Sequence, residues 1–133
     1  MAEGFEGLEV YQEARTLRAR IFRLSRQLPA EEKFVLVAQM RRAALSVTNN
    51  IAEGHGSRSY RHNMSYLYRA RGSLNELLDD MSACEDQGYF KKEHLDDLRR
   101  SAEPVAKLIN GYVAYLRKRL REVAATGPAQ RTS

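Results

Sequence analysis

The sequence predicts an all-α protein, an up-down-up-down antiparallel four-helix bundle. Apolar residues recur at steps of three and four along most of the chain, which is the period of an amphipathic helix. Only 8 Gly and 3 Pro interrupt 133 residues, too few for the many tight turns of an all-β fold. Short links separate four apolar stripes, and helices joined by short links pack antiparallel.

The first helix is expected over residues 6–28, where one apolar stripe ends just before Pro29. Proline lacks a backbone N–H and its ring clashes with the preceding turn, so it blocks continuation. The acids Glu31 and Glu32 then favour the first turn of the next helix, where they complement its dipole. The stripe consists of Leu8, Tyr11, Ala14, Leu17, Ile21, Leu24 and Leu28.

The second helix is expected over residues 30–53. It carries two adjacent stripes, and two stripes indicate burial against more than one neighbour. Gly54 is expected to end this helix in a left-handed turn, and residues 55–58 form the loop. The main stripe is Val37, Met40, Ala44, Val47 and Ile51, and the second is Ala38, Leu45 and Ala52.

The third helix is expected to begin at Ser57 or Ser59, because either serine can cap it, and to run to Gln87 before Gly88. Its stripe is Tyr60, Met64, Leu67, Leu74, Leu78 and Met81.

The fourth helix is expected to begin near residues 91–92. Pro104 lies inside it and should bend the helix without ending it, because the apolar spacing continues in register on both sides. Residues 1–123 are therefore expected to form one bundle, and residues 124–133 a flexible tail. The stripe is Leu95, Leu98, Ala102, Val105, Ile109, Tyr112 and Leu116.

Composition and pattern exclude several classes of protein. The formal net charge is +5, from 22 Lys+Arg and 17 Asp+Glu. No run of about 18 apolar residues is present, and the first residues lack the pattern of a signal peptide, so we expect a cytoplasmic protein without membrane contact. The single Cys84 fits a reducing compartment. The three histidines lack the spacing of metal ligands, so neither a metal nor a cofactor is expected.

Residues 39–59, QMRRAALSVTNNIAEGHGSRS, resemble the signature of the four-helix proteins of the 23S rRNA intervening-sequence family. The first helix resembles the family's opening pattern, and residues 70–77, ARGSLNEL, resemble its Ala-x-Gly-Ser-x-x-Glu-Leu run. The resemblance covers about residues 5–120. Its matching positions in the second helix and loop are Arg41, Arg42, Ala43, Ala44, Ser46, Val47, Asn50, Ile51, Ala52, Glu53, Gly54 and Arg58.

The resemblance implies an up-down bundle that assembles into a ring-shaped homopentamer and has no enzymatic activity. Some members are encoded inside insertions in bacterial 23S rRNA genes. A related branch, the accessory variability protein of diversity-generating retroelements, partners a reverse transcriptase and binds nucleic acid through a basic surface.

Arg41 and Arg42 allow two interpretations, a phosphate contact or a structural or interface contact, because guanidinium groups are suited to both. Arg41 lies between the two stripes of the second helix, so a structural or protomer-interface role is preferred, with Glu76 or Asp80 as its partner. Arg42 lies a further 100° round the helix and is expected to contact solvent or a ligand.

A second group of residues is interpreted as structural or interfacial: Asn50, Glu53, Gly54, Arg71, Gly72 and Ser73. Asn50 is expected to bond neighbouring backbone groups, and Glu53 to pair with Arg71 or Arg58. Glycine inside a helix costs about 1 kcal/mol relative to alanine. Close approach of the second helix at Ala44 or Ala52 would explain Gly72.

The antiparallel topology brings the loop between the second and third helices to the same end as the terminus of the fourth. The opposite end collects Glu31, Glu32, Asp79, Asp80, Glu85 and Asp86. In a ring of parallel protomers one rim would be basic, and such a rim attracts polyanions. The expected nucleic-acid-binding residues are Arg42, Arg58, Arg61, Arg117, Lys118, Arg119 and Arg121. Aromatic rings beside arginines can stack on bases, but Tyr60 lies on the core stripe and is expected to pack there, while Tyr66 and Tyr68 can face solvent or a neighbouring protomer.

Three functions remain open from the sequence. The leading one is a non-enzymatic, homo-oligomeric protein that binds RNA or DNA, or a nucleic-acid enzyme, through its basic rim. The second is a protein-interaction scaffold for a nucleic-acid enzyme such as a reverse transcriptase. The third is an all-helical RNase, against which the spacing counts: Arg58 and His62 are separated by three residues, whereas HEPN-type RNases have four to six.

Overall fold

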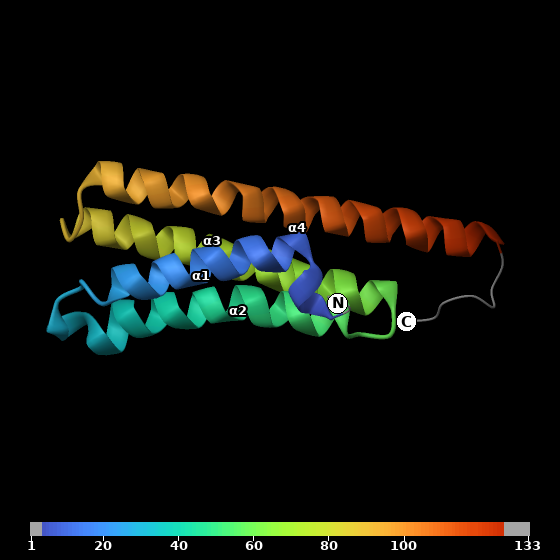
Figure 1. Cartoon of the computed structure of the whole chain (residues 1–133), viewed down its shortest axis with the longest axis horizontal. Helices are drawn as coiled ribbons and strands as arrows, with labels where there is room; N and C mark the ends of the chain where they lie inside the picture. Colours follow the sequence, from blue (N-terminus) through green and yellow to red (C-terminus); the bar gives the residue numbers. More distant parts are fainter. Residues whose placement is uncertain (1–3, 127–133) are drawn as a thin grey trace.

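The computed structural model describes residues 4–126 and contains four long α-helices packed side by side (Figure 1). They are α1 (Glu9–Ser25), α2 (Ala38–His55), α3 (Tyr60–Asp86) and α4 (Lys92–Thr126). Each helix runs back along its predecessor, and α1 also packs against α4, which closes the bundle. The predicted all-α class and four-helix packing are confirmed.

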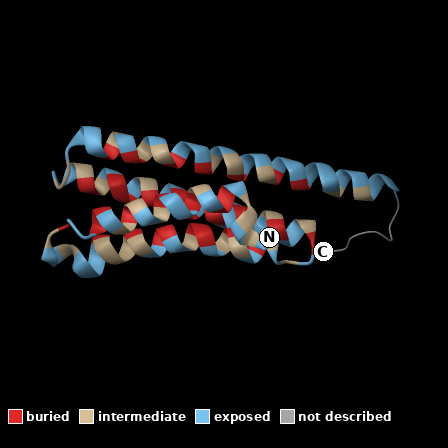
Figure 2. Ribbon diagram, in the orientation of Figure 1, coloured by how far each residue is buried: buried red, intermediate tan, exposed pale blue. Residues whose placement is uncertain are grey.

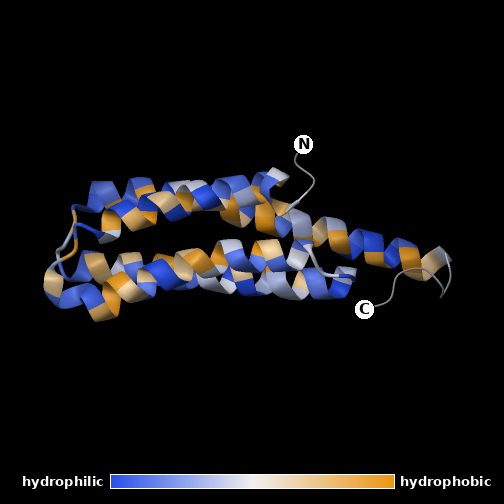
Figure 3. Ribbon diagram, turned by 60° about the horizontal axis from the view of Figure 1, so that its bottom comes forward, coloured by the Kyte–Doolittle hydropathy of each residue, from blue (hydrophilic) through white to orange (hydrophobic). Residues whose placement is uncertain are grey.

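One apolar core runs through the bundle, and the outer faces of the helices are mostly hydrophilic (Figures 2 and 3). All four helices contribute to it, as the helical spacing predicts. The second stripe of α2 is different, because Leu45 is 39% exposed and Ala38 and Ala52 are half-buried. The predicted burial of α2 against more than one neighbour is confirmed, since α2 packs on both α1 and α3, but its second stripe is only partly covered in the single chain. The core includes Ile21, Met40, Ile51, Leu67, Leu74, Leu77, Met81, Leu95 and Ile109.

The junction between α1 and α2 departs from the prediction of a helix starting at residue 30. A 3-10 turn (Ala30–Glu32) and a π-helical turn (Lys33–Val37) precede α2. A π turn contains one more residue per hydrogen bond than an α turn, so it changes which side chains face inward. Leu36 becomes buried, whereas Phe34 and Val35 are 83% and 58% exposed.

The ends of the other helices follow local chemistry. Ser59 caps α3, since its Oγ accepts a hydrogen bond from the backbone N of His62 at 3.1 Å, which decides between the two predicted caps. Gly88, with φ +72°, follows α3. α4 continues through Pro104 to Thr126, three residues into the predicted tail. The remainder of that tail, residues 127–133, lies outside the described residues.

Gly54 does not end α2 in a left-handed turn, because it is buried inside the helix, which continues to His55. Its role is close packing against α3. A Cβ at Gly54 would lie 2.6 Å from Asn63 Oδ1 and 3.0 Å from Tyr66 Cβ. The close approach predicted at Gly72 is wrong: Gly72 is exposed, and a Cβ there would meet nothing within 4 Å.

One carboxylate lies in the core, where the bundle has little water to solvate it. Asp80 of α3 is 4% exposed, and its Oδ2 has no hydrogen-bond partner in residues 4–126. Burial, and then the charges of Asp79 and Glu76, raise the pKa of Asp80 to about 6, against the lowering influence of Arg42. Asp80 therefore does not add to the acidic surface expected at the end of the bundle opposite the α2–α3 loop.

We predict opposite effects of alanine at the two helical glycines. Gly54→Ala should lower the free energy of unfolding by about 1–2 kcal/mol, because the new methyl group overlaps α3. Gly72→Ala should raise it by up to about 1 kcal/mol, because alanine favours the helix and meets nothing there. Urea unfolding followed by circular dichroism measures both, and equal effects would contradict the packing described.

We also predict that Asp80→Asn stabilises the protein near neutral pH. Because the pKa of Asp80 rises from 3.8 when unfolded to about 6 when folded, its unfavourable contribution is absent well below pH 4, grows between about pH 4 and pH 6, and is fully present above pH 6. The variant should gain about 3 kcal/mol at pH 7 and much less at pH 4. Thermal unfolding at the two pH values tests this, and a gain that does not depend on pH would refute it.

Candidate nucleic-acid interface

The two adjacent arginines of α2 turn to different neighbours. Arg41 faces α1: its Nε donates to Ser25 Oγ at 2.8 Å, and its guanidinium lies 5.1 Å from the centre of the Phe22 ring. The predicted pairing of Arg41 with Glu76 or Asp80 is therefore wrong. Arg42 is exposed, and it is the arginine whose charge acts on Asp80. It lies about three and a half helical turns from the end of α2, so it is not brought together with the loop arginines.

The small polar residues of the signature lie between α2 and α3. Asn50 Nδ2 donates to the Ser46 backbone oxygen at 2.8 Å, which is the local bond predicted for it, and to Ser46 Oγ at 3.0 Å. Ser46 Oγ is in turn hydrogen-bonded to the buried Ser73 Oγ at 2.7 Å, and either hydroxyl can be the donor. These residues form an interhelical contact between α2 and α3.

Arg71 crosses to α4 instead of pairing with Glu53. Its Nη1 donates to Asn110 Oδ1 at 2.8 Å, and its guanidinium lies 5.0 Å from the centre of the Tyr68 ring. The predicted Glu53–Arg71 pair is therefore wrong, and Glu53 is exposed at the end of α2.

Two segments at one end of the bundle are depleted of acids. No Asp or Glu occurs in residues 54–75, which carry four arginines and two histidines, and Glu122 is the one acid after Glu103. These two segments meet, because the α2–α3 loop and the end of α4 lie at the same end of the bundle (Figure 1). The cationic side chains exposed there are Arg58, Arg61, Arg69, Arg117, Lys118, Arg119 and Arg121, which we call the basic end.

At the basic end several arginines contact tyrosines. Arg69 lies 4.9 Å from the centre of the Tyr66 ring, and Arg117 Nη2 donates to Tyr68 Oη at 2.6 Å. Arg119 lies 6.0 Å from the centre of the Tyr60 ring and also pairs with Glu122 at 3.0 Å. A tyrosine orders a guanidinium without cancelling its charge.

Ion pairs with carboxylates are concentrated towards the other end of the bundle. Among residues 4–126 six ion pairs form, and five of them lie towards the other end, between residues of α1, α3 and the start of α4. Arg99 pairs with Glu85 at 2.7 Å and with Asp96 at 2.9 Å, and Arg20 pairs with Asp97 at 2.7 Å. Because carboxylates offset positive charge towards the other end and tyrosines do not offset it here, the positive electrostatic field is strongest at the basic end.

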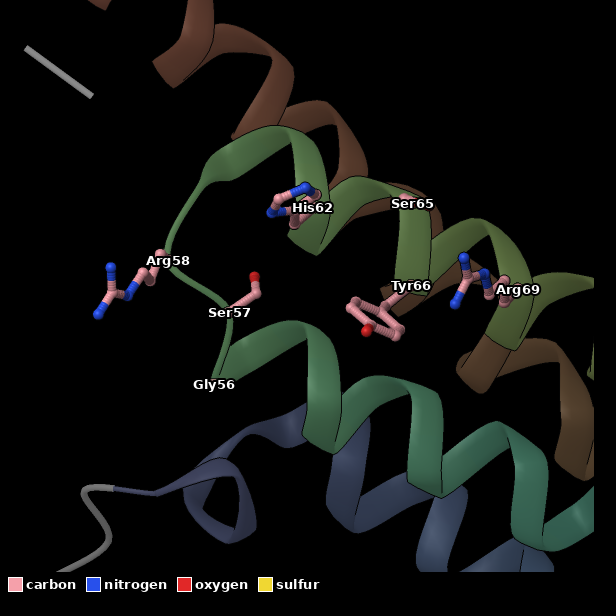
Figure 4. A pocket seen from close by; sticks show the side chains of 7 residues that line it. All are labelled: Gly56, Ser57, Arg58, His62, Ser65, Tyr66 and Arg69. Carbon is pink, nitrogen blue, oxygen red and sulfur yellow. The ribbon is translucent and has the colours of Figure 1, made fainter. Parts of the chain in front are cut away.

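A hollow of about 630 Å³ opens beside the α2–α3 loop. Figure 4 shows Tyr66 between Ser57 and His62 on one side and Arg69 on the other, whereas the guanidinium of Arg58 is directed away. The full lining is Gly56, Ser57, Arg58, His62, Ser65, Tyr66 and Arg69. The hollow combines hydrogen-bonding groups, a cation and an aromatic ring, the chemistry that binds a base and its phosphate.

A second hollow, of about 450 Å³, lies on the other flank of α3 and is lined by Arg61, Met64, Ser65, Tyr68 and Arg69. Ser65 and Arg69 line both hollows, so these two residues form the ridge between them. Tyr68 bonds Arg117, which places this second hollow beside α4.

A small polar network attaches the loop to α4. Tyr112 Oη accepts a hydrogen bond from Asn63 Nδ2 at 3.0 Å and lies 3.4 Å from His55 Nδ1. Ser57 Oγ donates to the Gly54 backbone oxygen at 2.6 Å. The end of α2, the loop and the start of α3 are thus held in one position against α4.

Arg69 and Ser65 belong to the site but were not predicted from the sequence, because no motif distinguishes them. The useful signal was the absence of acids over residues 54–75, which marks the whole segment and not only the loop. Among residues 4–126, no three His, Cys, Asp or Glu side chains cluster as metal ligands, and no helix is both long and apolar enough to span a membrane.

The fold and this surface define a class: a helical bundle with one cationic, tyrosine-rich end. The family model described as 23S rRNA-intervening sequence protein matches residues 6–111. The chain belongs to this family, as the sequence signature predicts. None of the curated proteins compared with the chain matches it.

The chain is similar to the 1.70 Å crystal structure of a protein of unknown function from the S23 ribosomal protein family of Bacteroides thetaiotaomicron. The TM-score is 0.72 at 23% identity, over 78% of this chain and 97% of that one. At this identity the likeness supports the bundle fold.

We predict that Tyr112→Phe loosens the loop. The variant keeps the ring but removes the hydroxyl that contacts Asn63 and His55, and the loss of such a part-buried bond costs about 1 kcal/mol. Urea unfolding should show that loss, and amides of residues 56–59 should exchange hydrogen faster. Unchanged exchange in these residues would show that the hydroxyl does not hold the loop.

Proposed function

We propose that the protein is a non-enzymatic, cytoplasmic, homo-oligomeric bundle that binds RNA or DNA through its basic end. The observation that carries the proposal is the partner of three arginines at this end: Arg69, Arg117 and Arg119 contact tyrosines. Five of the six ion pairs formed within residues 4–126 lie towards the other end. A phosphate backbone can therefore approach Arg69 and Arg117 without displacing a carboxylate. The family name, which refers to an rRNA insertion, favours RNA.

Assembly would strengthen such binding. Affinity for nucleic acid comes largely from counterions released as cations meet phosphates, and it grows with their number. The ring-shaped pentamer implied by the family resemblance would carry about +25 from five chains of +5. Exposed Leu45 on α2 is a candidate contact between protomers, and light scattering measures the oligomer.

The geometry at His62 supports a binding role over RNase activity. General acid–base cleavage needs a second positioned group within hydrogen-bond reach. His62 and Arg58 border the same hollow, but the Arg58 guanidinium is directed away from His62 (Figure 4).

A protein-interaction scaffold, for example for a reverse transcriptase, is the second candidate. The observation that favours it is the exposed pair Phe34 and Val35 on the π turn, at the end opposite the loop. Large exposed apolar side chains are typical of protein contacts. A pull-down that survives nuclease treatment, together with no binding of nucleic acid, would favour this role.

We predict that charge at the basic end, and not total charge, controls binding. Replacing Arg61, Lys118 and Arg121 with Gln should weaken RNA binding about tenfold or more at low salt and reduce the salt slope by about two to three units. Fluorescence anisotropy over a series of salt concentrations measures both.

The matched control removes the same charge from the opposite end, by Gln at Arg26, Lys33 and Lys91, all exposed. This control should bind almost as the wild type does. Equal losses in the two triple variants would reject the basic end as the site.

A further inference from the structure

We propose that the basic end binds single-stranded nucleic acid, with the strand crossing α3 at Arg69 and placing one base in the hollow beside Tyr66. This inference rests on the proposed function and names its ligand class. Its starting point is the pair of hollows on the two flanks of α3, which share Ser65 and Arg69 as a ridge.

Each hollow has the parts that one unstacked nucleotide requires. The first provides the Tyr66 ring with His62 and Ser65 as hydrogen-bonding groups, and the second provides Tyr68 and Arg61. Both hollows have the size of small-molecule pockets, which are about 300–1,000 Å³. An aromatic ring beside a cation binds bases of any sequence, because every base has a π face.

The ridge between the hollows is the place for the backbone. Arg69 is exposed and its guanidinium lies 4.9 Å from the centre of the Tyr66 ring, so a phosphate on the ridge meets a cation already ordered by stacking. Beyond the second hollow, Arg117 on α4 is held by Tyr68 and continues the cationic path. The path therefore runs from the α2–α3 loop, across α3, to α4.

A duplex cannot use this arrangement. Its bases are paired and stacked inside, and they reach a protein pocket only when unstacked or extruded. The convex ridge also separates the two hollows, whereas a duplex presents a continuous outer surface of phosphates. A site built only for duplex backbone would need the cations but not the tyrosine-lined hollows.

The test compares a labelled oligonucleotide of about 12 residues, as RNA and as DNA, with a hairpin duplex of the same composition, by anisotropy at two salt concentrations. Binding of either single strand about tenfold tighter than the duplex supports the proposal. Equal binding of strand and duplex overturns it while leaving the proposed function intact. Binding of none of the three overturns both.

Variants at Tyr66 then locate the base. Tyr66→Phe keeps the ring and should retain most of the affinity for the single strand, whereas Tyr66→Leu should lose about fivefold or more. An oligonucleotide containing 2-aminopurine should change its fluorescence on binding to wild type and Tyr66→Phe, but not to Tyr66→Leu.

Arg69→Gln, at an exposed position, should weaken single-strand binding without loss of thermal stability, which covers the case in which Tyr66→Leu fails to fold. Wild-type affinity in both Tyr66→Leu and Arg69→Gln would overturn the placement.

Discussion

The close contact of α2 with α3 at Gly54 is the constraint on which the functional end of the bundle depends. Because Gly54 has no side chain, Asn63 and Tyr66 of α3 can lie directly against the end of α2. That contact sets where the α2–α3 loop turns, and the loop forms one wall of the hollow beside Tyr66. Tyr112 then fixes the same region against α4 through Asn63. A backbone contact thus determines the position of side chains that carry the proposed chemistry.

The helical periods of the sequence were sufficient for the number of helices, their order and most of the core. They were insufficient at the start of α2, where the run Lys33–Val37 has no single apolar face and forms a π turn. The helical periods also gave the wrong role to each glycine: they predicted close packing at Gly72 and a helix end at Gly54. Both Gly54 and Gly72 lie in helices, and only the packing of α3 distinguishes the one that a methyl group would disrupt from the one it would not.

The candidate site shows a similar division. The sequence indicated a basic end, because topology alone brings the loop and the terminus of α4 together. It could not assign partners: Arg41 and Arg42 are adjacent, yet one turns to Ser25 and the other to the region of Asp80. Side chains 100° apart on a helix face different neighbours, and which neighbour each meets depends on the rotation of the whole helix within the bundle.

The length of α4 has a separate consequence. Its buried residues end at Leu116, and its last turns extend past the other helices (Figure 1). Arg117 and Arg121 are one turn apart and repel each other, while the contacts of Arg117 with Tyr68 and of Arg119 with Glu122 hold the segment in place. An anion bound between Arg117 and Arg121 would remove that repulsion. A polyanion lying along the segment would therefore stabilise the last turns of α4 as it binds.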